Sequence, residues 1–273
     1  MFTKIVFQDE FNLPFTPDER VFLGEGLFET LLVINNKPCY SKEHWQRLTR
    51  ASSSLAIPFT LSLDFWNEKL NEFIRYKNLN QGGIKVLLAS GKALRGLNEK
   101  SKDSSLIFSA LSFTKNAKPL KLISAAWQRD SKNLLYQVKS INYLEAIMAR
   151  RIAAEAGADD VLFFNFQNQV TDTTIANFFI IKNECLFTPP LSSGPLPGII
   201  RQRVLILCKN QNIECNEIEL DKASLIKAEA AFTTNALQGI KPVHSWDNHI
   251  FNSKHPLIDV LQKLLVSDQS GSC

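Results

Sequence analysis

A short polar segment that ends in proline, residues 114–119, is the feature that most constrains the fold of this sequence. A strand-like apolar pattern stops before this segment and resumes at Leu120. Such segments are typical of linkers, because few contacts cross them and proline cannot continue a regular element. The sequence therefore predicts a small N-terminal domain over residues 1–114, a linker over residues 115–120 and a large C-terminal domain over residues 121–273.

Both predicted domains mix strands with helices, which indicates the α/β (α+β) class. Runs rich in apolar and β-branched residues predict strands at residues 27–34, 84–90 and 106–113. The C-terminal domain alternates in the same way, with a long helix predicted from Ile199. In the N-terminal domain, a helix is predicted around residues 65–74 with this core face: Phe65, Trp66, Leu70, Phe73 and Ile74.

Composition and charge exclude several classes of protein. The 45% hydrophobic and 21% charged residues are those of an ordinary soluble globular protein. No apolar run reaches transmembrane length, and the first residues read as a strand and not as a signal peptide. The net charge of +4 is small and scattered, so it predicts no nucleic-acid partner and at most a mild attraction for anionic small molecules.

Cysteine and histidine give no sign of a metal or disulfide framework. The five cysteines form no CxxC pair and are odd in number, so we expect reduced thiols in a cytoplasmic protein. The four histidines lack ligand spacing, and we therefore predict no metal.

Lys139 is the candidate nucleophile. It follows a polar loop and precedes a helical pattern that reaches about Ala156. A lysine held against an apolar wall loses hydration and its pKa falls toward neutrality, as a Schiff-base lysine requires. A surface lysine at the end of a strand is the alternative. We predict that the following residues form the core face of this helix: Leu144, Ile147, Met148 and Ile152.

A second candidate site lies at Pro197-Gly198, where a long helix begins. A helix that opens on such a turn presents free backbone N–H groups and the positive end of its dipole, which suits a phosphate. An ordinary helix start is the alternative, and the segment alone does not separate the two.

Six segments in a fixed order carry a resemblance to a known family. They are residues 24–30 (GEGLFET), 44–48 (HWQRL), 139–144 (KSINYL), 170–172 (VTD), 196–199 (LPGI) and 234–236 (TNA). With these segments, the sequence resembles the fold-type IV pyridoxal-phosphate enzymes. That family includes branched-chain aminotransferases, D-amino-acid aminotransferases and 4-amino-4-deoxychorismate lyases. The resemblance extends from about Gly24 to Val243.

The resemblance implies a fold, a cofactor and an assembly. The implied fold has a smaller N-terminal α/β domain and a larger C-terminal domain with a β-barrel-like core flanked by helices. The implied cofactor is pyridoxal 5'-phosphate (PLP), and the implied assembly is a homodimer in the cytoplasm that binds a small-molecule substrate, without nucleic acid or membrane.

The resemblance also implies roles for particular residues. Lys139 would bond to the cofactor and then carry the proton. Arg47 would bind the phosphate, a task suited to a permanently charged planar group. The remaining implied cofactor-binding residues are the N–H groups of Ile199 and Ile200, the adjoining turn Thr234, Asn235 and Ala236, and Asp172, which would pair with the pyridine nitrogen.

Asp172 departs from the family pattern. Relatives usually carry glutamate after the threonine, and aspartate is one methylene shorter. A carboxylate is needed there because a protonated pyridine nitrogen is the better electron sink. The alternative is an aspartate that caps a turn.

The choice of reaction depends on substrate contacts, for which Lys85 and Arg95 are the candidates. A lysine at position 85, followed by glycine and Arg95-Gly96, resembles the lyases most. Lyases usually have arginine where this chain has Ser90, which weakens the match. Lys85 and Arg95 could equally be solvated strand and loop charges.

We predict a PLP-dependent lyase that converts 4-amino-4-deoxychorismate, a dicarboxylate, to p-aminobenzoate and pyruvate in folate biosynthesis. A branched-chain or D-amino-acid aminotransferase of the same fold is the first alternative. A non-catalytic binding protein that kept the fold is the second, and the set of Lys139, Arg47 and Asp172 argues against it.

Overall fold

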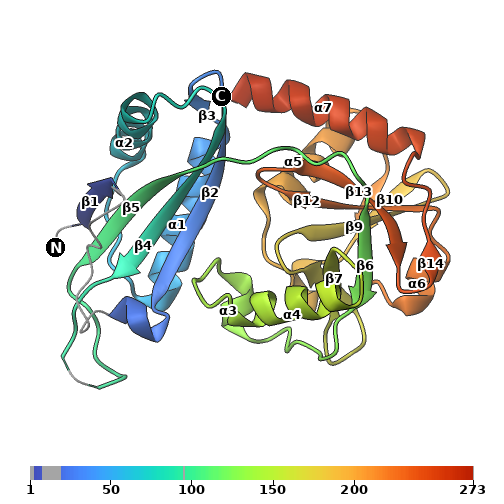
Figure 1. Cartoon of the computed structure of the whole chain (residues 1–273), viewed down its shortest axis with the longest axis horizontal. Coiled ribbons are helices and arrows are strands. Elements are labelled where there is room, and N and C mark those ends of the chain that lie inside the picture. Colours follow the sequence, from blue (N-terminus) through green and yellow to red (C-terminus); the bar gives the residue numbers. More distant parts are fainter. Residues whose placement is uncertain (1–2, 8–19, 95, 273) are drawn as a thin grey trace. The chain divides into compact units, whose positions relative to one another are not determined.

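The computed structural model describes residues 3–7, 20–94 and 96–272, with the backbone alone at 3–7 (Figure 1). Arg95, a predicted substrate contact, lies outside the described residues. The chain divides into two compact units. The first is Met1–Thr114 with Val138–Asn142 and Gln269–Cys273, and the second is Lys115–Gln137 with Tyr143–Asp268. Lys139 therefore belongs to the first unit although it follows the predicted linker.

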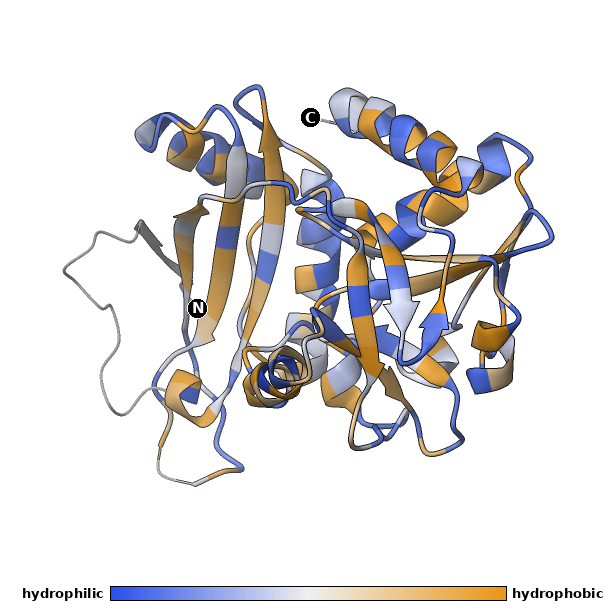
Figure 2. Ribbon diagram, turned by 45° about the vertical axis from the view of Figure 1, so that its right-hand side comes forward, coloured by the Kyte–Doolittle hydropathy of each residue, from blue (hydrophilic) through white to orange (hydrophobic). Residues whose placement is uncertain are grey.

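The described part of the first unit is built mainly from a sheet and two helices. The five strands of the sheet follow the order β1 (Thr3–Phe7), β5 (Ser104–Leu111), β4 (Gly82–Ser90), β2 (Gly26–Ile34) and β3 (Lys37–Pro38). The helices are α1 (Ser41–Leu55) and α2 (Leu63–Tyr76), and a 3-10 turn, η1, spans Arg20–Leu23. Figure 2 shows that the long strands carry mostly apolar residues, which form one core with the inner faces of α1 and α2.

Helix α2 illustrates why these residues fold as they do. Ser62 caps its first turn by accepting a hydrogen bond from the backbone N–H of Phe65 at 3.2 Å. Trp66, Leu70 and Phe73 are fully buried, as the helical spacing predicts. Phe65 is 36% exposed, so its predicted place in the core face is wrong; it lies one position before the buried stripe, on the flank of the helix.

The second unit is built on a closed barrel. Among the described residues, six strands form the ring: β6 (Leu120–Ser124), β7 (Asp160–Phe164), β8 (Val170–Thr173), β9 (Asn177–Lys182), β12 (Ala230–Asn235) and β13 (Gly239–Trp246). Pairing of Asp172 with Asn177 between β8 and β9 closes it. Strands β10 (Cys185–Thr188) and β11 (Cys215–Glu217) extend from β9, and β14 (His249–Ile250) pairs with β13. The predicted barrel-like core is confirmed.

Helices lie around this barrel (Figure 1). They are α3 (Leu134–Gln137), α4 (Leu144–Glu155), α5 (Ile199–Asn210), α6 (Lys222–Ile226), α7 (Pro256–Ser272) and the short 3-10 turn η2 (Leu191–Ser193). Helix α5 begins at Ile199, as predicted. Within the described ranges, no helix combines the length and the apolar character needed to cross a bilayer.

The predicted core face of α4 is wrong. The helix packs on the barrel through alanines, of which Ala149 and Ala153 contact the cluster around Phe163. Small side chains let a helix approach a sheet closely, so the larger residues turn outward. The residues that were predicted to form the core face, with their exposed fractions, are Leu144 (68%), Ile147 (44%), Met148 (48%) and Ile152 (37%).

The cysteines also differ from expectation at one position. Cys185, Cys208 and Cys215 are free thiols, whereas Cys39 is disulfide-bonded. The expectation that all the cysteines are reduced is therefore wrong for Cys39.

Replacing Phe73 by alanine should lower the free energy of unfolding by about 3–5 kcal/mol, because it removes a fully buried ring from the first unit's core. Phe65→Ala, on the same helix, is the matched control and should cost less than about 1 kcal/mol. Urea unfolding followed by circular dichroism measures both, and equal losses would contradict the assignment of the two faces.

Candidate active site

Backbone pairing fixes the position of Lys139. Its carbonyl oxygen accepts a hydrogen bond from the N–H of Phe28 at 2.9 Å, and Ile141 donates to the carbonyl of Gly26 at 3.1 Å. Residues 139–141 thus pair with Gly26–Phe28, at the start of β2. Gly24 permits this approach: its φ is +84°, and a Cβ there would lie 2.2 Å from Oδ1 of Asn142.

The amine of Lys139 shares an aromatic ring with a second lysine. Nζ of Lys139 lies 4.2 Å from the ring centre of Phe28, and Nζ of Lys85 lies 4.7 Å from it. In the sheet, Phe28 pairs with Leu87, so Lys85 is its diagonal neighbour on the same face. The ring provides the predicted apolar wall and brings two cations together, which favours an anionic group beside them.

Arg47, the predicted phosphate ligand, is held by a buried carboxylate that sequence reasoning missed. Its Nε and NH2 donate to the two oxygens of Glu29 at 2.8 and 2.6 Å, a bidentate pair. Nδ1 of His44 lies 2.6 Å from the same carboxylate. All three residues are buried. Glu29 lies in strand β2 among apolar neighbours, which is the one sequence signal that it needs a charged partner.

The charges in this cluster are set by burial and by the pairing. Burial raises the pKa of Glu29, but the Arg47 guanidinium and the His44 ring oppose it more strongly and lower that pKa to about 2. Burial lowers the pKa of His44, and the carboxylate of Glu29 only partly compensates. His44 is therefore a neutral ring that donates from Nδ1 to a charged carboxylate, and it orients Glu29 for Arg47.

Asp172 lies in strand β8 of the second unit and is not the cap of a turn. Its Oδ1 accepts from NH1 of Arg129 at 2.8 Å, and its Oδ2 accepts from the backbone N–H of Leu196 at 3.1 Å. Burial raises the pKa of Asp172, while the charge of Arg129 opposes the shift. The strand and the two donors thus fix the carboxyl group in one orientation.

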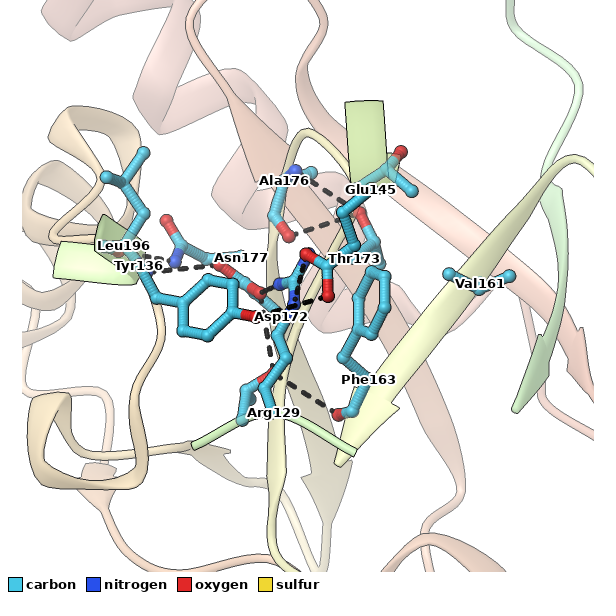
Figure 3. Close-up of polar contacts among 12 residues, drawn as sticks. Arg129, Tyr136, Glu145, Val161, Phe163, Asp172, Thr173, Ala176, Asn177 and Leu196 are labelled. Atoms are coloured by element: carbon cyan, nitrogen blue, oxygen red, sulfur yellow. Dashed lines mark hydrogen bonds and ion pairs between the residues drawn. The ribbon is translucent and has the colours of Figure 1, made fainter. Parts of the chain in front are cut away.

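Arg129 joins Asp172 to a second carboxylate, Glu145 (Figure 3). Nε and NH2 of Arg129 both donate to Oε2 of Glu145, at 3.0 and 2.8 Å. Oε1 of Glu145 accepts from Nε1 of Trp127 at 2.8 Å and from the hydroxyl of Tyr136 at 3.2 Å. The guanidinium also stacks on a ring of the barrel, Phe163, with 3.4 Å to its centre. Sequence reasoning assigned no role to Arg129, Glu145 or Tyr136, and their spacing carries no motif.

The start of α5 fits a phosphate group. Gly198 caps the helix without a side-chain hydrogen bond, and the N–H groups of Ile199 and Ile200 donate to no group within the described residues. A Cβ at Gly198 would lie 1.9 Å from Oδ1 of Asn177, so glycine is required for the close approach. These groups can receive an anion.

The end of β12 contributes a hydroxyl suited to the same ligand class. Oγ1 of Thr234 is buried and has no hydrogen-bond partner within the described residues. Asn235 turns its Oδ1 to the N–H groups of Leu237 and Gln238, at 3.2 and 2.9 Å, which fixes the turn that includes Ala236. A buried hydroxyl without a partner indicates that a ligand atom pairs with it. The residues of the second unit therefore fit a phosphorylated cofactor.

Another cluster, outside these groups, is explained by capping. Nε2 of His255 lies 3.5 and 3.8 Å from carboxylate oxygens of Glu229 and Glu184, an arrangement that could suit a cation. However, Nδ1 of His255 accepts from the backbone N–H of Leu257 at the start of α7. That bond places the ring proton on Nε2, where a metal would have to bind. The two carboxylates then orient a helix cap.

Acid should weaken the first unit through Glu29. Because its folded pKa is about 2 and its ordinary value is 4.5, the carboxylate contributes about 3 kcal/mol above pH 4.5, which is lost as the pH falls toward 2. Glu29→Gln should lower the free energy of unfolding by about 3–5 kcal/mol at neutral pH, because Arg47 stays buried without its counter-charge. The free energy of unfolding of this variant should also fall less steeply between pH 4.5 and pH 2.

Urea unfolding from pH 7 to pH 2 measures this effect. Glu155→Gln, at an exposed position of α4, is the control and should leave the pH profile unchanged. A Glu29→Gln profile as steep as that of the unaltered chain would contradict the assignment.

Known proteins share both the sequence pattern and the fold. The sequence model of the family described as amino-transferase class IV matches residues 26–246 of this chain. A solved Legionella pneumophila structure, provisionally described as a 4-amino-4-deoxychorismate lyase, is 47% identical, covers 98% of this chain and 100% of its own, and has a TM-score of 0.95. The aminodeoxychorismate lyase of Bacillus subtilis is 26% identical over 86% of this chain and 83% of its own. A Methanocaldococcus jannaschii protein, provisionally described as a branched-chain-amino-acid aminotransferase, is 29% identical over 87% and 84%. Because the match spans most of the sequence, the chain belongs to the class IV aminotransferase family, as the resemblance predicted.

Proposed function

We propose that the chain is a PLP-dependent lyase that converts 4-amino-4-deoxychorismate to p-aminobenzoate and pyruvate. The observation that carries the proposal is the pair of amines, Lys139 and Lys85, on the ring of Phe28. One amine can carry the chemistry while the other offers a counter-charge for a substrate with two carboxylates. The similarity to the Legionella pneumophila protein, over 98% of this chain, supports the same reaction.

Different residues would bind different parts of the cofactor. Lys139 would hold it through the ε-amine, and Arg47, oriented by Glu29, would bind its phosphate. The N–H groups of Ile199 and Ile200, the Thr234 hydroxyl and the turn at Asn235 and Ala236 complete the phosphate contacts. Asp172 pairs with the ring nitrogen. When bound, PLP withdraws electrons from the carbon that bears the substrate amino group.

The protein's own part in the reaction is mainly the movement of one proton. The amino group of the substrate would replace the ε-amine of Lys139 on the cofactor, and the freed amine would then take the proton from C4 of the substrate ring. The C3–O bond then breaks, the ring becomes aromatic, and the departing enolpyruvyl group takes up a proton on carbon to become pyruvate. Aromatisation supplies much of the driving force, so positioning is the larger demand on the chain. Lys85, with Arg95 as a second candidate, binds a substrate carboxylate.

A branched-chain or D-amino-acid aminotransferase activity is the second candidate function. It is favoured by the Methanocaldococcus jannaschii relative and uses the same Lys139. It differs in requiring a pocket that admits a 2-oxo acid after the amino acid. A non-catalytic role is the weakest alternative, because the chain keeps Lys139, Arg47 and a buried Asp172.

Purified chain loaded with PLP should release pyruvate and p-aminobenzoate from 4-amino-4-deoxychorismate. Lys139→Ala should lower kcat by at least about 10³-fold, because nucleophile and base are lost together. Lys85→Ala should raise KM by about tenfold and change kcat less. Lys37→Ala, at an exposed position of the first unit, is the control.

Product analysis decides between the candidates. Glutamate formation from an amino acid and 2-oxoglutarate, without p-aminobenzoate from the first substrate, would favour the aminotransferase. Failure of borohydride to trap the cofactor on Lys139 would contradict both enzymatic readings.

We also propose that the chain acts in the cytoplasm as a homodimer. The row of apolar residues on the outer face of α4 supports self-association, because exposed apolar side chains at helical spacing are typical of interfaces. This row comprises Leu144, Ile147, Met148 and Ile152.

Lysine at both Ile147 and Met148 should shift the chain from dimer to monomer in sedimentation velocity while leaving its circular dichroism unchanged. The matched control places lysine at Arg151 and Glu155, exposed positions of the same helix. A monomeric unaltered chain, or a dimer that survives the double substitution, would contradict the role of this face.

A further inference from the structure

The cluster of Asp172, Arg129 and Glu145 holds two carboxylates on one guanidinium (Figure 3). Arg129 donates one hydrogen bond from Nη1 to Asp172 and two, from Nε and Nη2, to Glu145. With both acids ionised, the cluster has a net charge of −1. A simple pair of Asp172 and Arg129 would have been neutral.

Neutral donors hold the carboxyl group of Glu145 in place. Trp127 and Tyr136 both donate to its Oε1, while Oε2 is left for Arg129. Two donors on one oxygen fix the orientation of the carboxyl group. Tyr136 also stacks near the guanidinium, 4.8 Å from ring centre to Cζ of Arg129. Glu145 is therefore a built element of the cluster and not a solvated surface acid.

We propose that Glu145 is a positioning residue that, by drawing the charge of Arg129 away from Asp172, strengthens the attraction of Asp172 for a protonated ring nitrogen of the cofactor. The inference rests on the proposed role of Asp172 toward PLP. It assigns to Glu145 a part in the reaction that is exerted through Arg129 and does not require contact with substrate.

The electrostatic reason follows from the environment of Asp172. Burial is the largest influence on this carboxyl and raises its pKa. Arg129, the N–H of Leu196 and the hydroxyl of Thr171 favour the ionised form, whereas the charge of Glu145 disfavours it. A carboxylate whose charge is neutralised by Arg129, and to which two neutral groups also donate, is a weak partner for another cation. The second negative charge restores that partnership, because in a buried site a nearby charge acts with little screening.

The first arm of the test uses the cofactor-free chain. Carboxyl ¹³C chemical shifts of labelled aspartate give the pKa of Asp172, with Asp172→Asn to assign the resonance. Glu145→Gln keeps the shape and removes the charge, so it should lower the pKa of Asp172. Tyr136→Phe removes a contact to Glu145 but no charge, and should leave that pKa unchanged.

The second arm uses the chain loaded with ¹⁵N-pyridine-labelled PLP. In Glu145→Gln the ring-nitrogen resonance should move toward the position of the neutral pyridine, with a fall in kcat and little change in KM. Glu145→Asp, which keeps the charge but shortens the side chain, should restore most of the shift and so separates charge from packing. It also stands in if Glu145→Gln does not fold.

The outcomes are distinct. An unchanged pKa of Asp172 in Glu145→Gln overturns the inference, whatever the activity. An altered pKa with an unmoved ring nitrogen overturns the proposed link to the cofactor. If the chain binds PLP but forms no p-aminobenzoate, the proposed function fails while both arms still decide the part played by Glu145.

Discussion

Each unit of this protein buries an arginine against a carboxylate, and the proposed chemistry depends on both pairs. Glu29 holds Arg47 in the first unit, and Asp172 pairs with Arg129 in the second. A buried ion of either sign is costly unless a partner compensates for the lost hydration. The pairing therefore fixes side-chain direction, because a guanidinium bound in one geometry cannot reorient without leaving a charge unpaired.

The two pairs differ in how they are completed. Glu29 receives a third polar group in His44, a neutral ring, so the first cluster is electrically neutral. Arg129 receives a second acid in Glu145, so with both acids ionised the second cluster carries a net negative charge. The neutral cluster orients Arg47 for the proposed phosphate contact. A negatively charged cluster at Asp172 would instead stabilise the protonated ring nitrogen of the proposed cofactor. The same motif of buried arginine and carboxylate thus serves two different electrostatic tasks.

Much of the architecture could be predicted because it follows from local pattern. Strand runs, the start of α5 and the barrel core follow from periodicity, helix-start signals and the family resemblance. The orientation of α4 could not be predicted, since both of its faces are apolar at helical spacing and only the tight fit of Ala149 and Ala153 against the barrel selects between them. Arg129 and Glu145 escaped notice because they are 16 residues apart and meet only through the tertiary fold.

The contact between Gly198 and Asn177 carries a consequence for how this chain can vary. Helix α5 approaches strand β9 so closely that a single added methyl would collide with the amide of Asn177, which itself donates to the carbonyl of Leu196 at 2.7 Å. Positions 198 and 177 are therefore coupled: bulk gained at one has to be given up at the other. Sequence drift near the proposed anion site should occur as paired exchanges, and an engineer who wishes to reshape it has to alter both positions together.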